Sequence, residues 1–137
     1  MLGAVTPLHE FMTRDVLSVA PEDTLGHSAE RMVERGAGSA VVTDYGRLIG
    51  ILTERDVLRA VAGRVHSSEA TVREWMTPDP VTVSQDTTAE EAAQIMLEND
   101  FRHLPVVEGE RAIGVVSIRD VARHTVGLGA DIDRAGP

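Results

Sequence analysis

The chain has 137 residues and a formal net charge of −9, and 42% of its residues are hydrophobic while only 3% are aromatic. This length suits one compact domain or two closely packed halves, with a core that Val, Ile, Leu, Ala and Met must fill. The acidic balance argues against general binding of nucleic acids or anionic membranes, and the absence of cysteine excludes disulfides, thiol catalysis and thiolate metal sites.

The first half of the chain predicts a short strand, a helix, two strands and a second helix, after an entry segment in which Pro7 begins a short helical turn. Thr24 suits the start of the first helix and Gly36 its end. Leu25, Ala29, Met32 and Val33 are expected on its buried face. The five elements are expected at residues 17–20, 24–36, 39–43, 48–52 and 54–62.

The second half repeats this order after a polar linker at residues 64–70 and a short helix at 71–76. Its first helix starts at Thr88 and should bury Ala89, Ala92, Ala93, Met96 and Leu97. The last helix should end near Gly127, followed by a Gly- and Asp-rich tail that is expected to fray. The strands are expected at residues 81–83, 104–107 and 112–116.

A heptapeptide occurs twice, as GILTERD at residues 50–56 and as GVVSIRD at 114–120. Paired positions differ by 64 throughout the two halves, and roughly a third of them are identical without a gap. In each copy two aliphatic residues suit the end of a buried strand, and a hydroxyl followed three residues later by aspartate suits a helix start. Each copy therefore predicts a strand-to-helix junction with an exposed hydroxyl and carboxylate.

Each half would form a sheet that its helices cover on one face only. Two such halves can bury their open faces against each other about an approximate twofold axis. This arrangement predicts two related clefts, each with one hydroxyl–aspartate junction at its edge.

The sequence resembles the CBS-domain family, named for the regulatory region of cystathionine beta-synthase. The resemblance rests on Met12-Thr13 and Met76-Thr77, on Leu104-Pro105-Val106-Val107, and on the two glycine-to-aspartate motifs. It implies an α+β fold of two tandem β-α-β-β-α repeats with pseudo-twofold symmetry and sheets packed face to face. The expected parts are repeat 1 at 8–63, a linker and short entry helix at 64–75, repeat 2 at 76–127 and a flexible tail at 128–137.

The resemblance also implies a non-catalytic regulatory module that senses energy state or metabolites by binding AMP, ADP, ATP or S-adenosylmethionine between the repeats. A carboxylate can accept both hydroxyls of a ribose diol, which suits Asp56 and Asp120. Thr53 and Ser117 can bond a phosphate or ribose oxygen. Arg102 and His103 stand where the family often carries residues that contact phosphate.

The two copies differ at one informative place, because Arg102 and His103 align with Gly38 and Ser39. If the two basic residues bind phosphate, the cleft of Asp120 should bind more strongly than that of Asp56. The family pattern implies facing residues for each cleft: Thr13, Val16, Ser18 and Ala37 for the Asp120 cleft, and Thr77, Pro80 and Thr82 for the Asp56 cleft.

Structural explanations exist for each of these residues. Thr53 with Asp56, and Ser117 with Asp120, can be helix N-cap boxes. Gly50 and Gly114 can allow a ligand to approach or can simply mark strand kinks. Arg102 can be a solvated surface residue.

Other classes of function have less support. No nucleophile-and-base signature, Walker loop or metal-binding helix occurs, and the five histidines are scattered, so neither an enzyme nor a metal site is expected. An RNA-binding regulator and a structural dimerisation unit with empty clefts remain alternatives. A homodimer is expected, with Val57, Leu58, Val121 and Ala122 as candidates for its surface. We also expect a regulated partner that is a separate protein, and a cytoplasmic location, since no signal peptide or long apolar run is seen.

Overall fold

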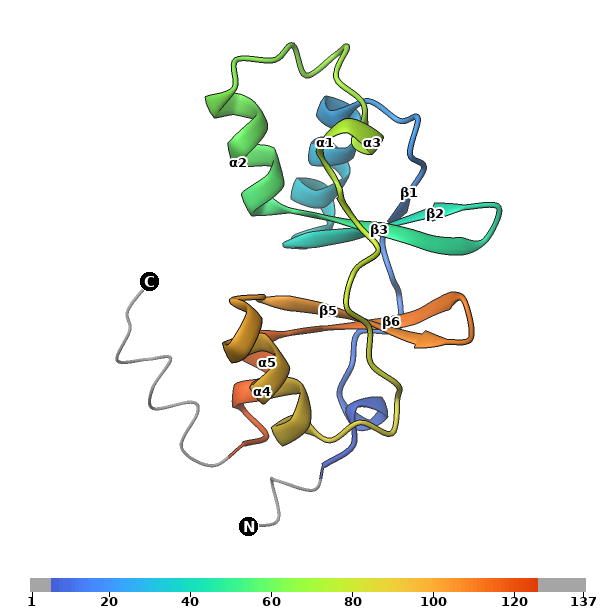
Figure 1. Cartoon of the computed structure of the whole chain (residues 1–137), viewed down its shortest axis with the longest axis vertical. Helices are drawn as coiled ribbons and strands as arrows, with labels where there is room; N and C mark the ends of the chain where they lie inside the picture. Colours follow the sequence, from blue (N-terminus) through green and yellow to red (C-terminus); the bar gives the residue numbers. More distant parts are fainter. Residues whose placement is uncertain (1–5, 126–137) are drawn as a thin grey trace. The chain divides into compact units, whose positions relative to one another are not determined.

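The structure is a computed structural model that describes residues 6–125. The chain forms two compact units (Figure 1). Unit 2 comprises residues 15–80 and the short segment 109–112, whereas the described part of unit 1 comprises residues 6–14, 81–108 and 113–125. The units therefore cut across the two sequence repeats, because the segment that enters each repeat belongs to the unit with the other repeat's helices.

The elements of unit 2 are β1 (Ser18–Val19), α1 (Leu25–Arg35), β2 (Ser39–Asp44), β3 (Arg47–Thr53), α2 (Glu54–Ala62), α3 (Val72–Trp75) and β4 (Thr77–Pro78). The strands form a four-stranded sheet in the order β1-β2-β3-β4, in which β1 is parallel to β2 and the other pairs are antiparallel. A bulge after Val42 offsets the pairing of β2 with β3.

The helix ends in unit 2 follow local chemistry. The Thr24 hydroxyl accepts a hydrogen bond from the His27 amide, and Gly36 adopts φ = 62°, the left-handed conformation that glycine reaches at low cost. The core of unit 2 consists of residues with no or very little exposure, among them Leu17, Leu25, Val42, Leu52 and Val72. Leucine, valine, alanine and methionine side chains thus supply the buried residues of this core in place of aromatic rings.

Unit 1 repeats this plan with fewer regular strands. Strands β5 (His103–Glu108) and β6 (Arg111–Ser117) form a two-stranded sheet. Val83 bridges Val106 in parallel, and Thr13 bridges Val115 antiparallel, in the places that β1 and β4 take in unit 2. The other elements are η2 (Leu8–Glu10), α4 (Ala89–Asn99) and α5 (Ile118–Ala122).

Residues 6–14 belong to unit 1 (Figure 1, dark blue beside yellow and orange), and Leu8 and Met12 are part of its core. Amides of Leu8 and His9 donate to the carbonyls of Thr87 and Gln85 at 2.9 and 3.0 Å. The Leu8 side chain is fully buried beside Ala89 and Val121. The first residues of repeat 1 therefore help to fold repeat 2.

The order of elements in both halves agrees with the sequence prediction, and the mixed α+β fold with two tandem repeats is confirmed. The predicted strand at 81–83 is reduced to the single bridge at Val83. The last helix ends at Ala122, earlier than expected. The predicted tail lies outside the described residues.

The prediction that Val33 and Leu97 are buried is wrong, because Val33 is 81% exposed and Leu97 is 61% exposed. Each lies eight residues after the first buried residue of its helix, Leu25 or Ala89. At 3.6 residues per turn this places the side chain about 80° around the helix from that residue. The buried residues of the two helices do not extend that far around the helix in this direction.

Among residues 6–125, no helix is both long and apolar enough to span a membrane.

Candidate functional site

In unit 2 the junction between β3 and α2 is a closed capping box. The Thr53 hydroxyl accepts from the Asp56 amide at 3.3 Å. In return, Asp56 Oδ2 accepts from the Thr53 amide at 2.9 Å and from the Thr53 hydroxyl at 3.1 Å. These bonds satisfy amide groups that the start of a helix otherwise leaves without partners.

The second oxygen of Asp56 is also engaged. Asp56 Oδ1 lies 3.2 Å from Nη1 of Arg59, one helical turn later, and the Asp56 side chain is only 5% exposed. A ribose diol would have to displace these partners to bind the carboxylate. The contacts of Asp56 therefore support its role in a helix N-cap box with Thr53.

In unit 1 the junction between β6 and α5 has a more open form. The Ser117 hydroxyl accepts from the Asp120 amide at 3.2 Å, and Asp120 Oδ1 pairs with Arg123 Nη1 at 3.2 Å. Within the described chain, the return bond from the Ser117 amide to the Asp120 carboxylate is not formed. The Asp120 side chain is 33% exposed, so one carboxylate oxygen can take a new donor.

The backbone brings Arg102 to this junction. The carbonyl of Arg102 accepts from the Ile118 amide at 2.8 Å, as the carbonyl of Gly38 accepts from Glu54 at 3.1 Å in unit 2. The Arg102 residue is exposed, and His103 is half-buried at the start of β5. Unit 1 therefore places an arginine beside its junction where unit 2 places a glycine.

The two motif glycines have a packing role. A Cβ on Gly114 would lie 2.7 Å from Met12 Sδ, and a Cβ on Gly50 would lie 2.5 Å from Met76 Sδ. The carbonyls of Thr13 and Thr77 would be 3.2 and 3.0 Å away. Glycine is needed here because the entry segment of the other repeat packs against the strand, which explains why Met-Thr and glycine occur together in both copies.

The remaining predicted site residues are divided between the units. Thr13 donates to and accepts from Val115 at 3.0 Å, which fixes it beside β6, and Thr77 pairs with Ile51 of β3. The Ser18 hydroxyl lies 2.7 Å from that of Thr43. Unit 1 holds Thr13, Thr82, Arg102, His103, Gly114, Ser117 and Asp120, while unit 2 holds Val16, Ser18, Ala37, Gly50, Thr53, Asp56, Thr77 and Pro80.

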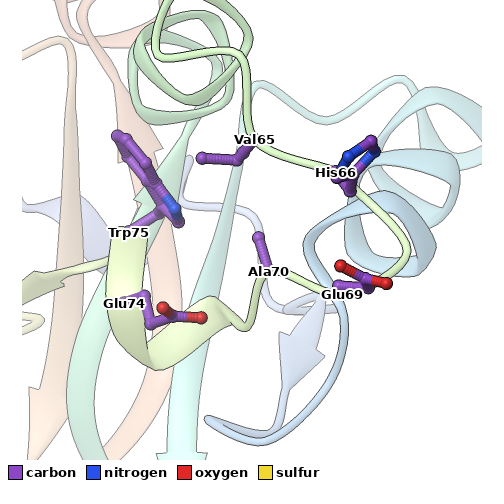
Figure 2. A pocket seen from close by; sticks show the side chains of 6 residues that line it. All are labelled: Val65, His66, Glu69, Ala70, Glu74 and Trp75. Atoms are coloured by element: carbon purple, nitrogen blue, oxygen red, sulfur yellow. The ribbon is translucent and has the colours of Figure 1, made fainter.

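Unit 2 also contains an open depression of about 370 Å³ beside the linker (Figure 2). The pKa of the Glu74 carboxyl is lowered by a hydrogen bond from the Thr71 amide and a second from the Thr71 hydroxyl. The depression is lined by Val65, His66, Glu69, Ala70, Glu74 and Trp75, and includes none of the predicted site residues, all of which the structure describes.

Two aromatic contacts near the junctions have no counterpart in the sequence predictions. The Trp75 ring lies below the Arg59 guanidinium at 6.0 Å, and the Phe11 ring stacks on that of His124 at 4.1 Å. The only available signal was the alignment of Phe11 with Trp75 in the repeat, 64 residues apart.

Comparison with known proteins gives one consistent result. The family model described as "CBS domain" matches residues 8–63 and 72–127. An uncharacterized 17.7 kDa protein of Acidianus ambivalens is 39% identical over 131 residues, which cover 90% of this chain and 79% of that protein.

An inosine-5′-monophosphate dehydrogenase of Korarchaeum cryptofilum is 38% identical over 122 residues, or 88% of this chain, and the match spans only 25% of that enzyme. The crystal structure of the CBS domain pair of protein MJ0100 superposes with a TM-score of 0.80 at 22% identity, covering 86% of this chain and 98% of that one. At this identity the superposition supports the fold alone. The family model accounts for both halves of the sequence, and the chain therefore belongs to the CBS domain family as a tandem pair.

Proposed function

We propose that this chain is a non-catalytic regulatory module that binds an adenosine nucleotide chiefly at the Ser117–Asp120 junction. The observation that carries the proposal is the difference between the two aspartates. Asp120 is 33% exposed with one oxygen paired to Arg123, whereas Asp56 is 5% exposed with both oxygens engaged.

The chemistry of the Ser117–Asp120 junction suits a ribose. A carboxylate accepts two vicinal hydroxyls, and the negative charge strengthens each hydrogen bond. Arg123 can hold one oxygen without blocking the other. The structure of the MJ0100 CBS domain pair, a protein with the same fold, was determined with 5′-methylthioadenosine and S-adenosyl-L-methionine, both of which contain adenosine. This supports adenosine as the shared part of the ligand.

A phosphate is stabilised by a cation near the ribose position, and Arg102 is a candidate because its carbonyl accepts from the Ile118 amide at the junction. Arginine is suited to phosphate because its planar guanidinium donates two parallel hydrogen bonds. We therefore favour AMP, ADP or ATP over S-adenosylmethionine, whose sulfonium is positive.

Calorimetric titration with AMP and with adenosine tests this assignment. We expect AMP to bind the wild-type protein, and Arg102→Ala to weaken AMP about tenfold or more, because a hydrogen bond to a charged group contributes about 1.5–3 kcal/mol. Adenosine has no phosphate, so its affinity should be equal in the two proteins.

The matched control is Arg111→Ala, which removes an exposed arginine from the far end of β6. An equal loss of AMP affinity in both variants would indicate a general charge effect. If no adenosine compound, S-adenosylmethionine included, binds the wild-type protein, the proposed function is wrong.

We also propose that the chain forms a homodimer through exposed apolar residues of its helices. Of the candidates for this surface, Val121 is fully buried in the core of unit 1 and cannot contribute, whereas Leu58 is 69% exposed. Val61, in the next turn of α2, is 65% exposed. Two exposed apolar residues on one helix are consistent with a surface that a second copy of the chain covers.

Light scattering at micromolar concentration should give twice the 14.8 kDa mass of the chain. Leu58→Asp should shift the protein toward the monomer, because it places a charge in the apolar surface. Tyr45→Asp is the matched control, since Tyr45 is 99% exposed but lies in the β2–β3 turn. A wild-type monomer mass would contradict the dimer.

A further inference from the structure

The two junctions differ in the groups that contact the arginine three residues after the aspartate, Arg59 in unit 2 and Arg123 in unit 1. Arg59 and Arg123 are equivalent in the repeat, and so are the aromatic residues Trp75 and Phe11 of the two entry segments. The residue after each arginine differs, being Ala60 in the first copy and His124 in the second. This difference changes the partner of the aromatic ring.

In unit 2 the ring and the carboxylate both contact Arg59. The guanidinium carbon lies 6.0 Å from the centre of the Trp75 ring, and Nη1 lies 3.2 Å from Asp56 Oδ1. A cation at this distance from an indole ring is attracted to it. Trp75 is half-buried against the core of unit 2, and its ring lies close to Gly63. Figure 2 shows the same ring lining the depression beside the linker.

In unit 1 the equivalent ring is taken by another partner. Phe11 stacks on the His124 imidazole with a centroid distance of 4.1 Å and an angle of 18° between planes. Within residues 6–125, the Arg123 guanidinium pairs with Asp120 alone, and its side chain is 74% exposed. Arg123 is therefore tied to one group where Arg59 is tied to two.

We propose that Trp75 and His124 are positioning residues that decide which junction carboxylate is available to a ligand. Trp75 keeps Arg59 on Asp56 Oδ1, the oxygen that the bonds from Thr53 leave available. His124 occupies the Phe11 ring, which leaves Arg123 free to move aside from Asp120. This inference rests on the proposed function and explains why one nucleotide per chain should bind tightly.

Calorimetric titration with AMP tests the proposal in four proteins: wild type, Trp75→Leu, Arg59→Gln and His124→Ala. Wild type should show one tight and one weaker event. Trp75→Leu and Arg59→Gln should strengthen the weaker event about two- to fivefold, which is the factor that corresponds to one exposed cation–π contact. His124→Ala should weaken the tight event by a similar factor, because Phe11 can then attract Arg123.

The double variant Trp75→Leu/Arg59→Gln separates positioning from a general structural effect. If Trp75 acts through Arg59, the double variant should bind the second AMP no better than Arg59→Gln alone. A second readout needs no ligand: the Arg59 Nε–H signal in NMR spectra should shift when the Trp75 ring current is removed, while that of Arg123 should not.

Each result decides the proposal. The inference is overturned if wild type binds the first AMP tightly but neither Trp75→Leu nor Arg59→Gln changes the affinity of the weaker binding event. That result leaves the proposed function intact. Additive effects in the double variant, or an Arg59 signal that does not respond to loss of the ring, also overturn it. If wild type binds no AMP at all, both proposals fail.

Discussion

Asp120→Ala should weaken AMP binding by roughly 30- to 150-fold, while Asp56→Ala should change it much less. A carboxylate that accepts two hydrogen bonds from a diol contributes roughly 2–3 kcal/mol after water has replaced part of the loss. Asp120 can supply this interaction because it is 33% exposed and is paired only with Arg123 among the described residues. Calorimetry on the two variants measures both losses directly.

The stability of the same two variants should show the opposite order. Asp56 accepts two bonds from Thr53 and one from Arg59 at a site that is almost fully buried. Its replacement by alanine removes the return bonds of the capping box and the pair with Arg59, and should lower the free energy of unfolding by about 1–2 kcal/mol. Asp120→Ala loses only an exposed ion pair, for which up to about 1 kcal/mol is expected.

This crossed pattern distinguishes the two roles. Urea unfolding measures the free energy of unfolding of Asp56→Ala and Asp120→Ala, and calorimetry measures their affinities for AMP. The two roles predict opposite orders for these two quantities. Equal losses of affinity would remove the asymmetry between the junctions. If neither variant loses affinity, both aspartates have a structural role only and the ligand contacts other residues.

Leu8→Ala should lower the free energy of unfolding by about 2–5 kcal/mol, the usual cost of emptying a leucine site in a core. Leu8 is fully buried, and it packs in the core of unit 1 with residues such as Met96 and Val121. The size of the effect would be unexpected for a residue so near the N-terminus, since such segments are often poorly ordered.

His9→Ala is the matched control, because His9 neighbours Leu8 but is exposed. Its effect should stay within about 0.5 kcal/mol. Amide hydrogen exchange then locates the damage: in Leu8→Ala, the amides of α4 and β5 should lose protection before those of α1 and β2. Faster exchange that starts in unit 2 would contradict the assignment of residues 6–14 to unit 1.

Much of the local structure was predictable from the sequence because it depends on short-range chemistry. Thr24 and Thr88 start helices, Gly36 ends one, and the hydrophobic runs at 39–43 and 104–107 form strands, as expected. The 64-residue repeat is enough to identify the paired junctions, and the motifs within it indicate the family. The arginine and histidine at 102 and 103 already predicted that the junctions would differ.

Only the tertiary structure decided which segments pack together. Repetition aligns Met12 with Met76, but it cannot say that Met12 packs on Gly114 and Met76 on Gly50, because both pairings satisfy the same local pattern. The availability of each aspartate likewise depends on contacts between side chains. Thr53 and Ser117 occupy equivalent positions, yet only the first closes a capping box with its aspartate among the described residues. The ring that lies beside Arg59 belongs to Trp75, in the entry segment of repeat 2. A contact of this kind depends on how the elements pack and not on their local sequence.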